Sequence, residues 1–166
     1  MFDIEPVSLG VSILLLLGFI TPIYLYKIKQ SKKTLLQKSI FQQTERDLGI
    51  ECLEKEFWRD YYAVGLDSDK KKLLYIKFDP ETEIQVTDLK NCTHVAQYQQ
   101  TEKINNGKIN REIINKIGLK LTCLKSNRPD ILLEFYNGDL FSDHQGEGPM
   151  ALKWKELIAQ NLRKNT

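Results

Sequence analysis

YYAVGLDSDKKKLLYIKF, residues 61–78, holds two apolar runs on either side of a polar turn. Tyr62, Val64 and Leu66 alternate with Tyr61, Ala63 and Gly65, and a second run, 72–78, follows the turn residues 67–70. Successive side chains of a strand point to opposite faces, so alternation with a polar turn between two runs is typical of a β-hairpin. The stretch therefore predicts two antiparallel strands at the start of a β-rich domain.

Further strands are expected on the C-terminal side of this hairpin. Turn residues separate several short apolar runs there, and the clearest alternation places Ile117, Leu119, Leu121 and Cys123 on one face. The expected strands cover 84–87, 92–99, 116–123 and 131–135, with breaks at 79–81, 105–107 and 126–129. The last two strands are expected to pair antiparallel.

An amphipathic helix is expected at the C-terminal end. Pro149 suits a first helical turn, and the apolar residues behind it fall on one stripe. These residues are Met150, Trp154, Leu157, Ile158 and Leu162. The expected fold class is therefore α+β: an antiparallel sheet or open barrel of about six to seven strands, closed by the C-terminal helix. Residues 50–166 form this domain, which is long enough for one packed core.

Residues 7–26, VSLGVSILLLLGFITPIYLY, carry no charge and predict a transmembrane helix. At about 1.5 Å per residue, twenty helical residues match the hydrocarbon thickness of a bilayer. A cleaved signal peptide is the alternative, but Asp3 and Glu5 precede the run and no small-residue cleavage site follows it. We therefore expect a short extracytoplasmic tail, 1–6, followed by a single membrane span.

The basic residues that follow the span set its expected orientation. Lys and Arg near a span stay on the cytoplasmic side, so the C-terminal domain is expected in the cytoplasm and the N-terminus outside the plasma (inner) membrane. The residues expected to contact lipid are Pro22, Tyr24, Tyr26, Lys27, Lys29, Lys32 and Lys33. The alternative for the lysines is that they only fix the topology. Residues 27–49 are expected to continue as a basic helical stalk that ends at Gly49.

In the order of its elements, the C-terminal domain resembles the pleckstrin-homology-like (PH-like) superfold. The resemblance rests on the hairpin 61–78, on the segment 84–95 as the middle strands, and on a final helix built around Trp154. The resemblance covers roughly residues 57–162. With its expected anchor, the chain is similar to single-span, membrane-anchored bacterial proteins of this kind. The resemblance implies a binding scaffold whose loops or sheet edge hold a ligand or partner.

Lipid-binding members of that superfold carry basic residues in the first two strands. The resemblance makes Lys70, Lys71 and Lys72 a candidate ligand loop. This chain departs from the pattern, because its second strand has no arginine and Asp67 and Asp69 flank the lysines. A solvated turn is the alternative.

Aromatic residues gather where the stalk meets the domain. Phe57, Trp58 and Tyr61 form a candidate partner surface, since Trp and Tyr suit interfaces that are partly wet. The alternative is that alternate residues of this group pack in the core of the first strand.

Catalytic signatures are weak. Cys92 and His94 lie two apart on an expected strand, but no third group orients them as a nucleophile and base. Asp139, Asp143, His144 and Glu147 precede the last helix and are the weak candidates for a metal site, although their spacing is not that of an EF-hand. A polar loop is the alternative. No cofactor is expected.

Composition narrows the function further. The formal net charge of +2 is too small to indicate a nucleic-acid partner. The number of cysteines, 3, is odd, which favours free buried thiols in a reducing cytosol. Two hypotheses follow. The first is a non-enzymatic, membrane-tethered binding or scaffold module for another protein at the cytosolic face, with lipids contacted through the anchor. The second is a small membrane-bound, metal-dependent hydrolase that uses the loop of Asp139, Asp143, His144 and Glu147.

Overall fold

The computed structural model describes residues 6–105, 110–124 and 130–163. The chain divides into two compact units, 1–47 and 48–166, and each unit is described by itself. Most of the expected tail, 1–6, and most of the expected turns at 105–107 and 126–129 lie outside the described residues.

The described part of the first unit is one long helix, α1 (Pro6–Leu48), which contains Pro22 and all the residues expected to contact lipid. Gly49 follows α1 with a φ of 59°, which is the left-handed conformation that glycine adopts most easily after a helix. The helix is thus continuous through residues 27–48 and ends before Gly49. Within the described residues, no helix combines the length and the apolar character that crossing a bilayer requires.

The second unit begins with a four-stranded antiparallel sheet. Its order is β1 (Glu54–Trp58), β2 (Tyr62–Asp67), β3 (Lys72–Lys77) and β4 (Glu83–Asp88). The expected hairpin is confirmed, because Tyr62 pairs with Lys77 and Asp67 pairs with Lys72. Its turn is held by Asp67, whose carboxylate accepts backbone hydrogen bonds from Lys70 at 2.8 Å and Glu51 at 2.9 Å.

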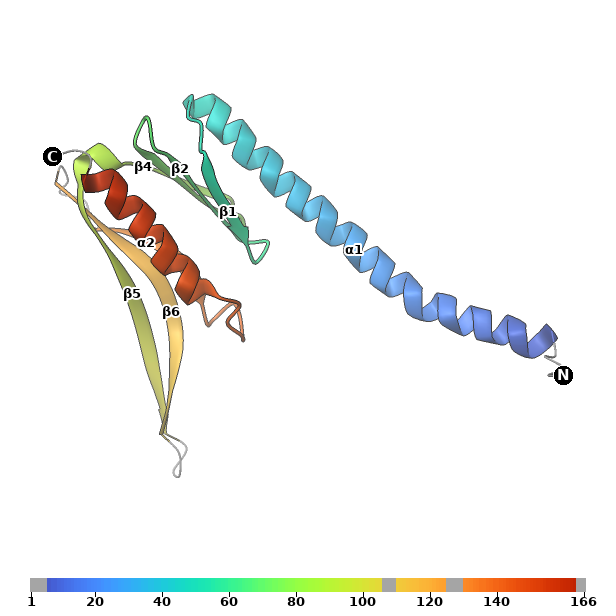
Figure 1. Cartoon of the computed structure of the whole chain (residues 1–166). Helices are drawn as coiled ribbons and strands as arrows, with labels where there is room; N and C mark the ends of the chain where they lie inside the picture. The colour runs from blue at the N-terminus through green and yellow to red at the C-terminus, as the bar shows by residue number, and fades with distance from the viewer. Residues whose placement is uncertain (1–5, 106–109, 125–129, 164–166) are drawn as a thin grey trace. The chain divides into compact units, whose positions relative to one another are not determined.

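A three-stranded antiparallel sheet follows, in the order β5 (Cys92–Asn105), β6 (Asn110–Cys123) and β7 (Ile131–Asn137). The short 3-10 helix η1 (Leu89–Asn91) connects the two sheets. Strand β7 pairs with residues 116–121 of β6, so the far ends of β5 and β6 continue as a two-stranded ribbon, which Figure 1 shows projecting from the rest of this unit.

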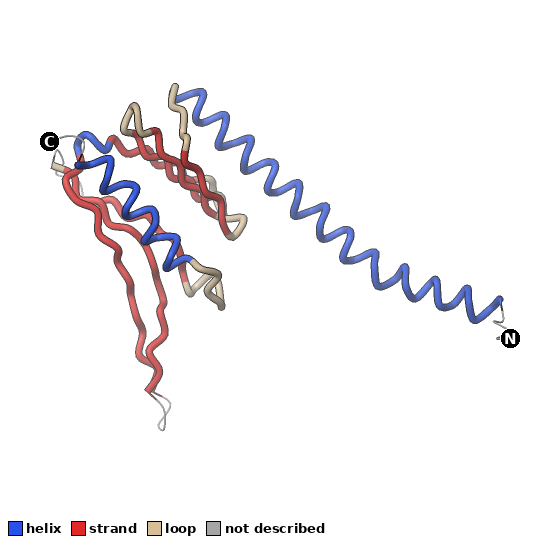
Figure 2. Tube along the Cα trace, viewed as in Figure 1, coloured by secondary structure: helices blue, strands red, loops and turns tan. Residues whose placement is uncertain are grey.

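The last element is helix α2 (Glu147–Arg163), which packs against η1 and all three strands β5, β6 and β7 (Figure 2). The core of this unit combines both sheets with one face of α2, which contributes Ala151, Trp154 and Ile158. Trp58 links the two sheets directly, because its indole Nε1 donates a hydrogen bond of 2.8 Å to the backbone oxygen of Phe135.

The α+β class, the antiparallel pairing and the C-terminal helix are therefore confirmed. One part of the expectation needs correction: the described strands form two sheets, of four and three strands, and not the single sheet or open barrel that was expected. Strand β1 and the outer halves of β5 and β6 were not expected from the sequence, and α2 begins at Glu147, two residues before Pro149.

Candidate functional site

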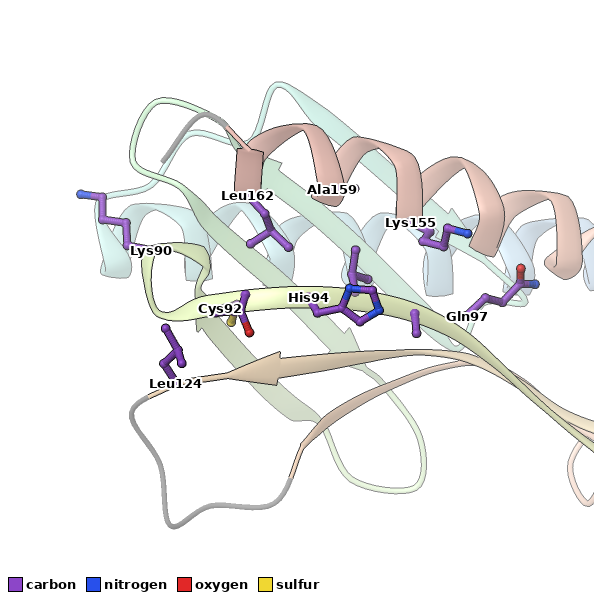
Figure 3. Close-up of a pocket in the computed structure, with 11 residues that line it drawn as sticks. Lys90, Cys92, His94, Gln97, Leu124, Lys155, Ala159 and Leu162 are labelled. Carbon is purple, nitrogen blue, oxygen red and sulfur yellow. The ribbon is translucent and has the colours of Figure 1, made fainter. Parts of the chain in front are cut away.

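A cavity of about 760 Å³ lies between strand β5 and helix α2 (Figure 3). We call it the β5–α2 groove. Its walls come from η1, the first half of β5, the residue that follows β6 and the C-terminal half of α2. The lining residues are Lys90, Cys92, Thr93, His94, Val95, Ala96, Gln97, Leu124, Lys155, Ala159 and Leu162.

One wall of this groove is the edge of a β-sheet. Six consecutive lining residues, 92–97, belong to β5, and within the described residues β5 pairs with β6 alone. Every second residue of such an edge directs its backbone N–H and C=O groups away from the sheet. The groove therefore presents a row of backbone hydrogen-bonding groups beside α2.

A β-bulge shapes the near end of this edge. The pairing of β5 with β6 shifts between Cys92 and His94, which leaves Thr93 as the extra residue. The Thr93 hydroxyl donates a hydrogen bond of 3.2 Å to the backbone oxygen of Thr122. A bulge of this kind bends and twists its strand, so it sets the direction in which the edge leaves η1.

The chemistry of the lining is apolar in part and basic in part. Its apolar lining residues are Val95 and Ala96 of β5, Ala159 and Leu162 of α2, and Leu124, which is 79% exposed. Its charged or titratable side chains are Lys90, His94 and Lys155, and the lining residues include no carboxylate.

Cys92 lies at the end of the groove and forms a disulfide with Cys123. The two residues face each other at the end of the β5–β6 pair, with their Cα atoms 3.8 Å apart. The expectation of three free thiols is therefore wrong, and Cys52 is the free, buried cysteine. A thiolate at Cys92 acting with His94 is excluded for the disulfide form, because Cys92 has no free thiol there.

The candidate partner surface of Phe57, Trp58 and Tyr61 needs correction. Trp58 and Tyr61 are each 8% exposed and belong to the core, while Phe57 is half-buried. Trp58 stacks on Phe135 with ring centroids 4.9 Å apart, and Tyr61 packs edge-on against Phe141. The alternative interpretation, core packing, describes Trp58 and Tyr61.

The candidate ligand loop of Lys70, Lys71 and Lys72 also has internal partners. The ammonium group of Lys70 donates to the backbone oxygen of Gly49, and that of Lys71 donates to the backbone oxygen of Asn161 at 3.2 Å. Lys72 lies between Asp67 and Asp88 in the strand register. Lys70 and Lys71 thus hold neighbouring segments of their own domain.

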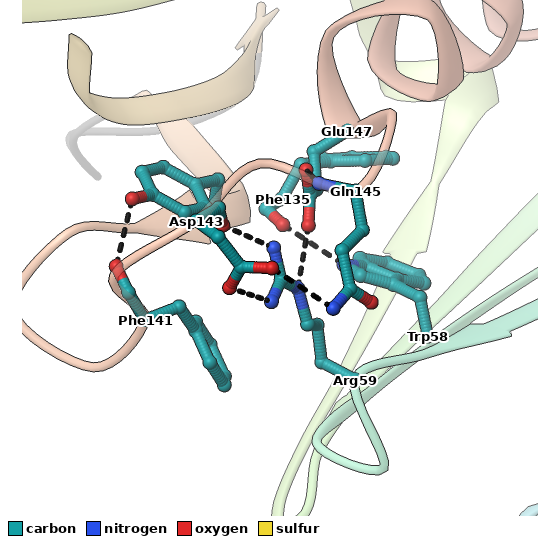
Figure 4. Close-up of polar contacts among 8 residues, drawn as sticks. Trp58, Arg59, Phe135, Phe141, Asp143, Gln145 and Glu147 are labelled. Atoms are coloured by element: carbon teal, nitrogen blue, oxygen red, sulfur yellow. Dashed lines mark hydrogen bonds and ion pairs between the residues drawn. The ribbon is translucent and has the colours of Figure 1, made fainter.

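The candidate metal loop is organised around a cation of the chain itself. Arg59, in the turn between β1 and β2, donates from Nε to Glu147 at 2.6 Å and from Nη1 to Asp143 at 2.9 Å (Figure 4). Asp139 is exposed, and the ring of His144 lies against Tyr136 with centroids 4.1 Å apart. Among the described residues, no three such side chains lie close enough to hold a metal ion.

The electrostatics of this loop follow from the same contacts. Burial alone would lower the pKa of Arg59, but its hydrogen bonds to Glu147 and Asp143 outweigh burial and raise that pKa. The hydrogen bond from Arg59 lowers the pKa of Asp143, and a second one from Gln145 adds to this effect. Both charges stay in place at neutral pH, so the cluster acts as a structural ion pair.

A second polar cluster lies between the two sheets. The hydroxyl of Tyr62 donates to a carboxylate oxygen of Glu134 at 2.6 Å, and the hydroxyl of Tyr75 donates to the backbone oxygen of Glu134 at 2.7 Å. Burial, followed by the hydrogen bond to Glu134, raises the pKa of Tyr62, and burial also raises that of Tyr75. These phenols therefore remain protonated donors, which suits a structural contact.

Comparison with known proteins adds no relative to this description: no family model, no curated protein and no solved structure matches the chain. The geometry of the domain is therefore the basis for inferring its function. The β5–α2 groove was not predicted from the sequence. The signal that could have found it is the order of the strands, because a strand at 92–99 that pairs only with the following one leaves its other edge open.

Proposed function

We propose that this protein is a non-enzymatic binding module, held at the cytosolic face of a membrane by its N-terminal helix, that binds an extended segment of another protein. The bound segment adds to the free edge of β5 and lies in the β5–α2 groove. In this mode the main chain of the partner supplies hydrogen bonds and its side chains supply selectivity.

The observation that carries the proposal is the coincidence of an open strand edge with an accessible cavity. Residues 92–97 of β5 supply the edge, and Ala159 and Leu162 of α2 supply an apolar wall beside it. Six residues of strand span roughly 20 Å, which is enough for a short extended peptide. A strand edge next to a helix gives an added strand both main-chain partners and a surface on which its side chains pack.

The membrane anchor and the PH-like domain are two further parts of the proposal, and their support comes from outside the groove. The uncharged run 7–26 followed by five lysines supports a membrane anchor with the domain in the cytosol. An order of four strands, three strands and a final helix supports a PH-like domain. Tethering a weak binder to the membrane raises its effective concentration near partners there.

Photocrosslinking in intact cells tests the binding mode. The photoreactive amino acid p-benzoylphenylalanine is introduced in the full-length chain either at Gln97, which lines the groove, or at Gln160, an exposed residue of α2 outside the lining. We expect one protein, identified by mass spectrometry, to be captured reproducibly from Gln97 and not from Gln160. Capture of the same proteins from both positions, or of none from Gln97, would contradict the proposal.

The location is tested separately with a protease-sensitive tag at Thr166. We expect the tag to be resistant in intact cells and cleaved once the membrane is permeabilised, with the full-length chain in the membrane fraction. Cleavage from outside intact cells would overturn the cytosolic placement. Recovery of the full-length chain in the soluble fraction would overturn the anchor.

A further inference from the structure

The charge of the β5–α2 groove is one-sided. Lys90 lies at its η1 end with its exposed side chain directed outward, Lys155 lies on α2, and His94 lies between them on β5 (Figure 3). No aspartate or glutamate is among the lining residues. The whole chain carries nearly equal numbers of basic and acidic residues, 24 and 22, so this local excess of positive charge does not follow from composition.

The groove lysines also differ from other lysines of the domain. Lys153 forms an ion pair with Glu56 at 2.9 Å, and Lys120 forms one with Asp130 at 2.7 Å. Lys70 and Lys71 reach backbone oxygens of their own domain. Lys155 follows Lys153 by two residues on α2 but lines the groove. Lys155 is half-buried, and Figure 3 shows its side chain below α2 on the side of β5.

From these observations we infer that the occupant of the groove is an acidic extended polypeptide, in which glutamate or aspartate alternates with apolar residues. This inference rests on the proposed function. In an added strand, alternate side chains face the same side. The register of the added strand decides whether a given set of its side chains packs against Leu124, Ala159 and Leu162 or lies near Lys90 and Lys155. Acidic side chains match Lys90 and Lys155, whereas a basic segment is repelled.

A defined peptide tests the inference on the full-length protein in phosphatidylcholine nanodiscs. The probe is an eight-residue peptide of alternating glutamate and valine, capped at both ends and labelled with fluorescein, whose binding is followed by fluorescence anisotropy. Two control peptides carry glutamine or lysine in place of glutamate. Because the probe alternates strictly, all its glutamates face one side of the added strand, and a shift of register by one residue turns them to the opposite side, so the probe can choose the register in which they meet the lysines.

We expect the glutamate peptide to bind about tenfold more tightly than the glutamine peptide at low salt, as two exposed ion pairs would give, and the lysine peptide to bind most weakly. Added salt should reduce the difference, since exposed charges are screened. The variants Lys155→Gln and Lys90→Gln should each weaken binding of the glutamate peptide. The variant Lys153→Gln should leave this binding unchanged, and Lys155→Arg should retain it. Tryptophan fluorescence checks that each variant is folded.

Equal binding of the glutamate and glutamine peptides would overturn the inference and leave the strand-addition proposal standing, because a neutral strand would then bind. If no peptide binds, the inference is overturned. Photocrosslinking at Gln97 then tests the proposed function independently. Loss of the glutamate peptide when the nanodiscs contain phosphatidylglycerol would also overturn it, because the lysines would then serve anionic lipid. Equal effects of Lys155→Gln and Lys153→Gln would do the same.

Discussion

The Nε atom of Arg59 lies 2.6 Å from an oxygen of Glu147, and the two side chains are only 6% and 2% exposed. Arg59 belongs to the turn between β1 and β2, and Glu147 is the first residue of α2. The guanidinium also lies 4.9 Å from the ring centre of Phe141. This buried pair connects the four-stranded sheet to the start of the C-terminal helix, which forms one wall of the β5–α2 groove.

Replacing Glu147 should therefore be far more costly than replacing the other acidic partner of Arg59. Glu147→Ala leaves a buried guanidinium without its main partner, and we expect a loss of about 3–5 kcal/mol in the free energy of unfolding. Asp143→Ala removes a carboxylate that is 61% exposed, and we expect a loss below about 1 kcal/mol.

Urea unfolding of the full-length chain in detergent measures both variants. Both tryptophans of the chain, Trp58 and Trp154, belong to the core of the second unit, so their fluorescence reports on that unit. Equal losses for Glu147→Ala and Asp143→Ala would show that burial of the pair does not govern its contribution.

Asp67 should make the stability of the domain depend on pH in the acid range. Burial acts to raise its pKa, but backbone hydrogen bonds from Lys70 and Glu51 outweigh burial, and the folded-state pKa lies below the ordinary value of 3.8. The unfolded chain thus binds a proton at a higher pH than the folded chain does. The stabilising contribution of Asp67 is complete above about pH 5 and is lost as the pH falls below 3.8 toward the folded-state pKa.

Asp67→Asn should accordingly be less stable than the wild type at pH 7, and this difference should shrink as the pH falls below about 4. Asp69→Asn removes the same charge from an exposed position in the same turn and serves as the control. Unfolding by urea at a series of pH values measures the effect. A difference for Asp67→Asn that stays constant down to the acid transition would contradict the assignment.

The parts of the fold predicted from sequence are those that depend on local order. The alternation of 62–66 and 72–78 around a polar turn predicted the β2–β3 hairpin, and the 3.6-residue stripe around Trp154 predicted α2. Both signals use neighbouring residues only. Strand β1 was missed because its sequence, EKEFW, begins with charged residues and shows no apolar alternation. Its pairing with β2 decides its conformation.

The candidate site depends on non-local contacts, which explains why its residues were not found. The groove exists because β5 lies at an edge, and the disulfide exists because the register places Cys92 opposite Cys123, 31 residues further on. Register follows from turn length and bulges, which composition does not reveal. Likewise, the acidic loop before α2 carries residue types that can bind a metal, but its Glu147 binds Arg59, 88 residues away in the sequence.

Gly118 should be intolerant of any side chain. An added Cβ would lie 2.5 Å from the backbone oxygen of Leu133 and 2.4 Å from the ring of Tyr98. Because a backbone atom of β7 blocks this position, relief requires a shift of the strand, and Gly118→Ala should cost about 1–3 kcal/mol.

Gly148→Ala is the matched control for Gly118→Ala. Gly148 lies in α2, where nothing is within 4 Å of an added Cβ, and alanine favours a helix over glycine by up to about 1 kcal/mol. Gly148→Ala should thus be neutral or stabilising in the same urea experiment. A stable Gly118→Ala variant would mean that β6 and β7 separate more easily than their packing implies.

The Cys92–Cys123 bond gives a thiol count that can be measured directly. Denaturing the full-length chain without reductant and labelling it with maleimide should modify one cysteine, Cys52, whereas labelling after reduction should modify all 3. Cys52→Ser should remove the single label and leave the other two dependent on reduction. Three labels without reductant, in protein purified under oxidising conditions, would contradict the pairing of Cys92 with Cys123.

The same count, made in cells quenched with acid before labelling, connects the disulfide with the proposed location. Disulfides persist in oxidising compartments and are rare and mostly transient in the cytosol. A domain at the cytosolic face should therefore be recovered chiefly with 3 free thiols and should form the bond after exposure to oxidant. Because the bond joins residues 31 apart and so restricts the unfolded chain, Cys92→Ser with Cys123→Ser should be about 2–4 kcal/mol less stable than the oxidised wild type and close in stability to the reduced wild type. Quantitative bonding in rapidly quenched cells would place the domain on the other side of the membrane, against the orientation that the lysines predict.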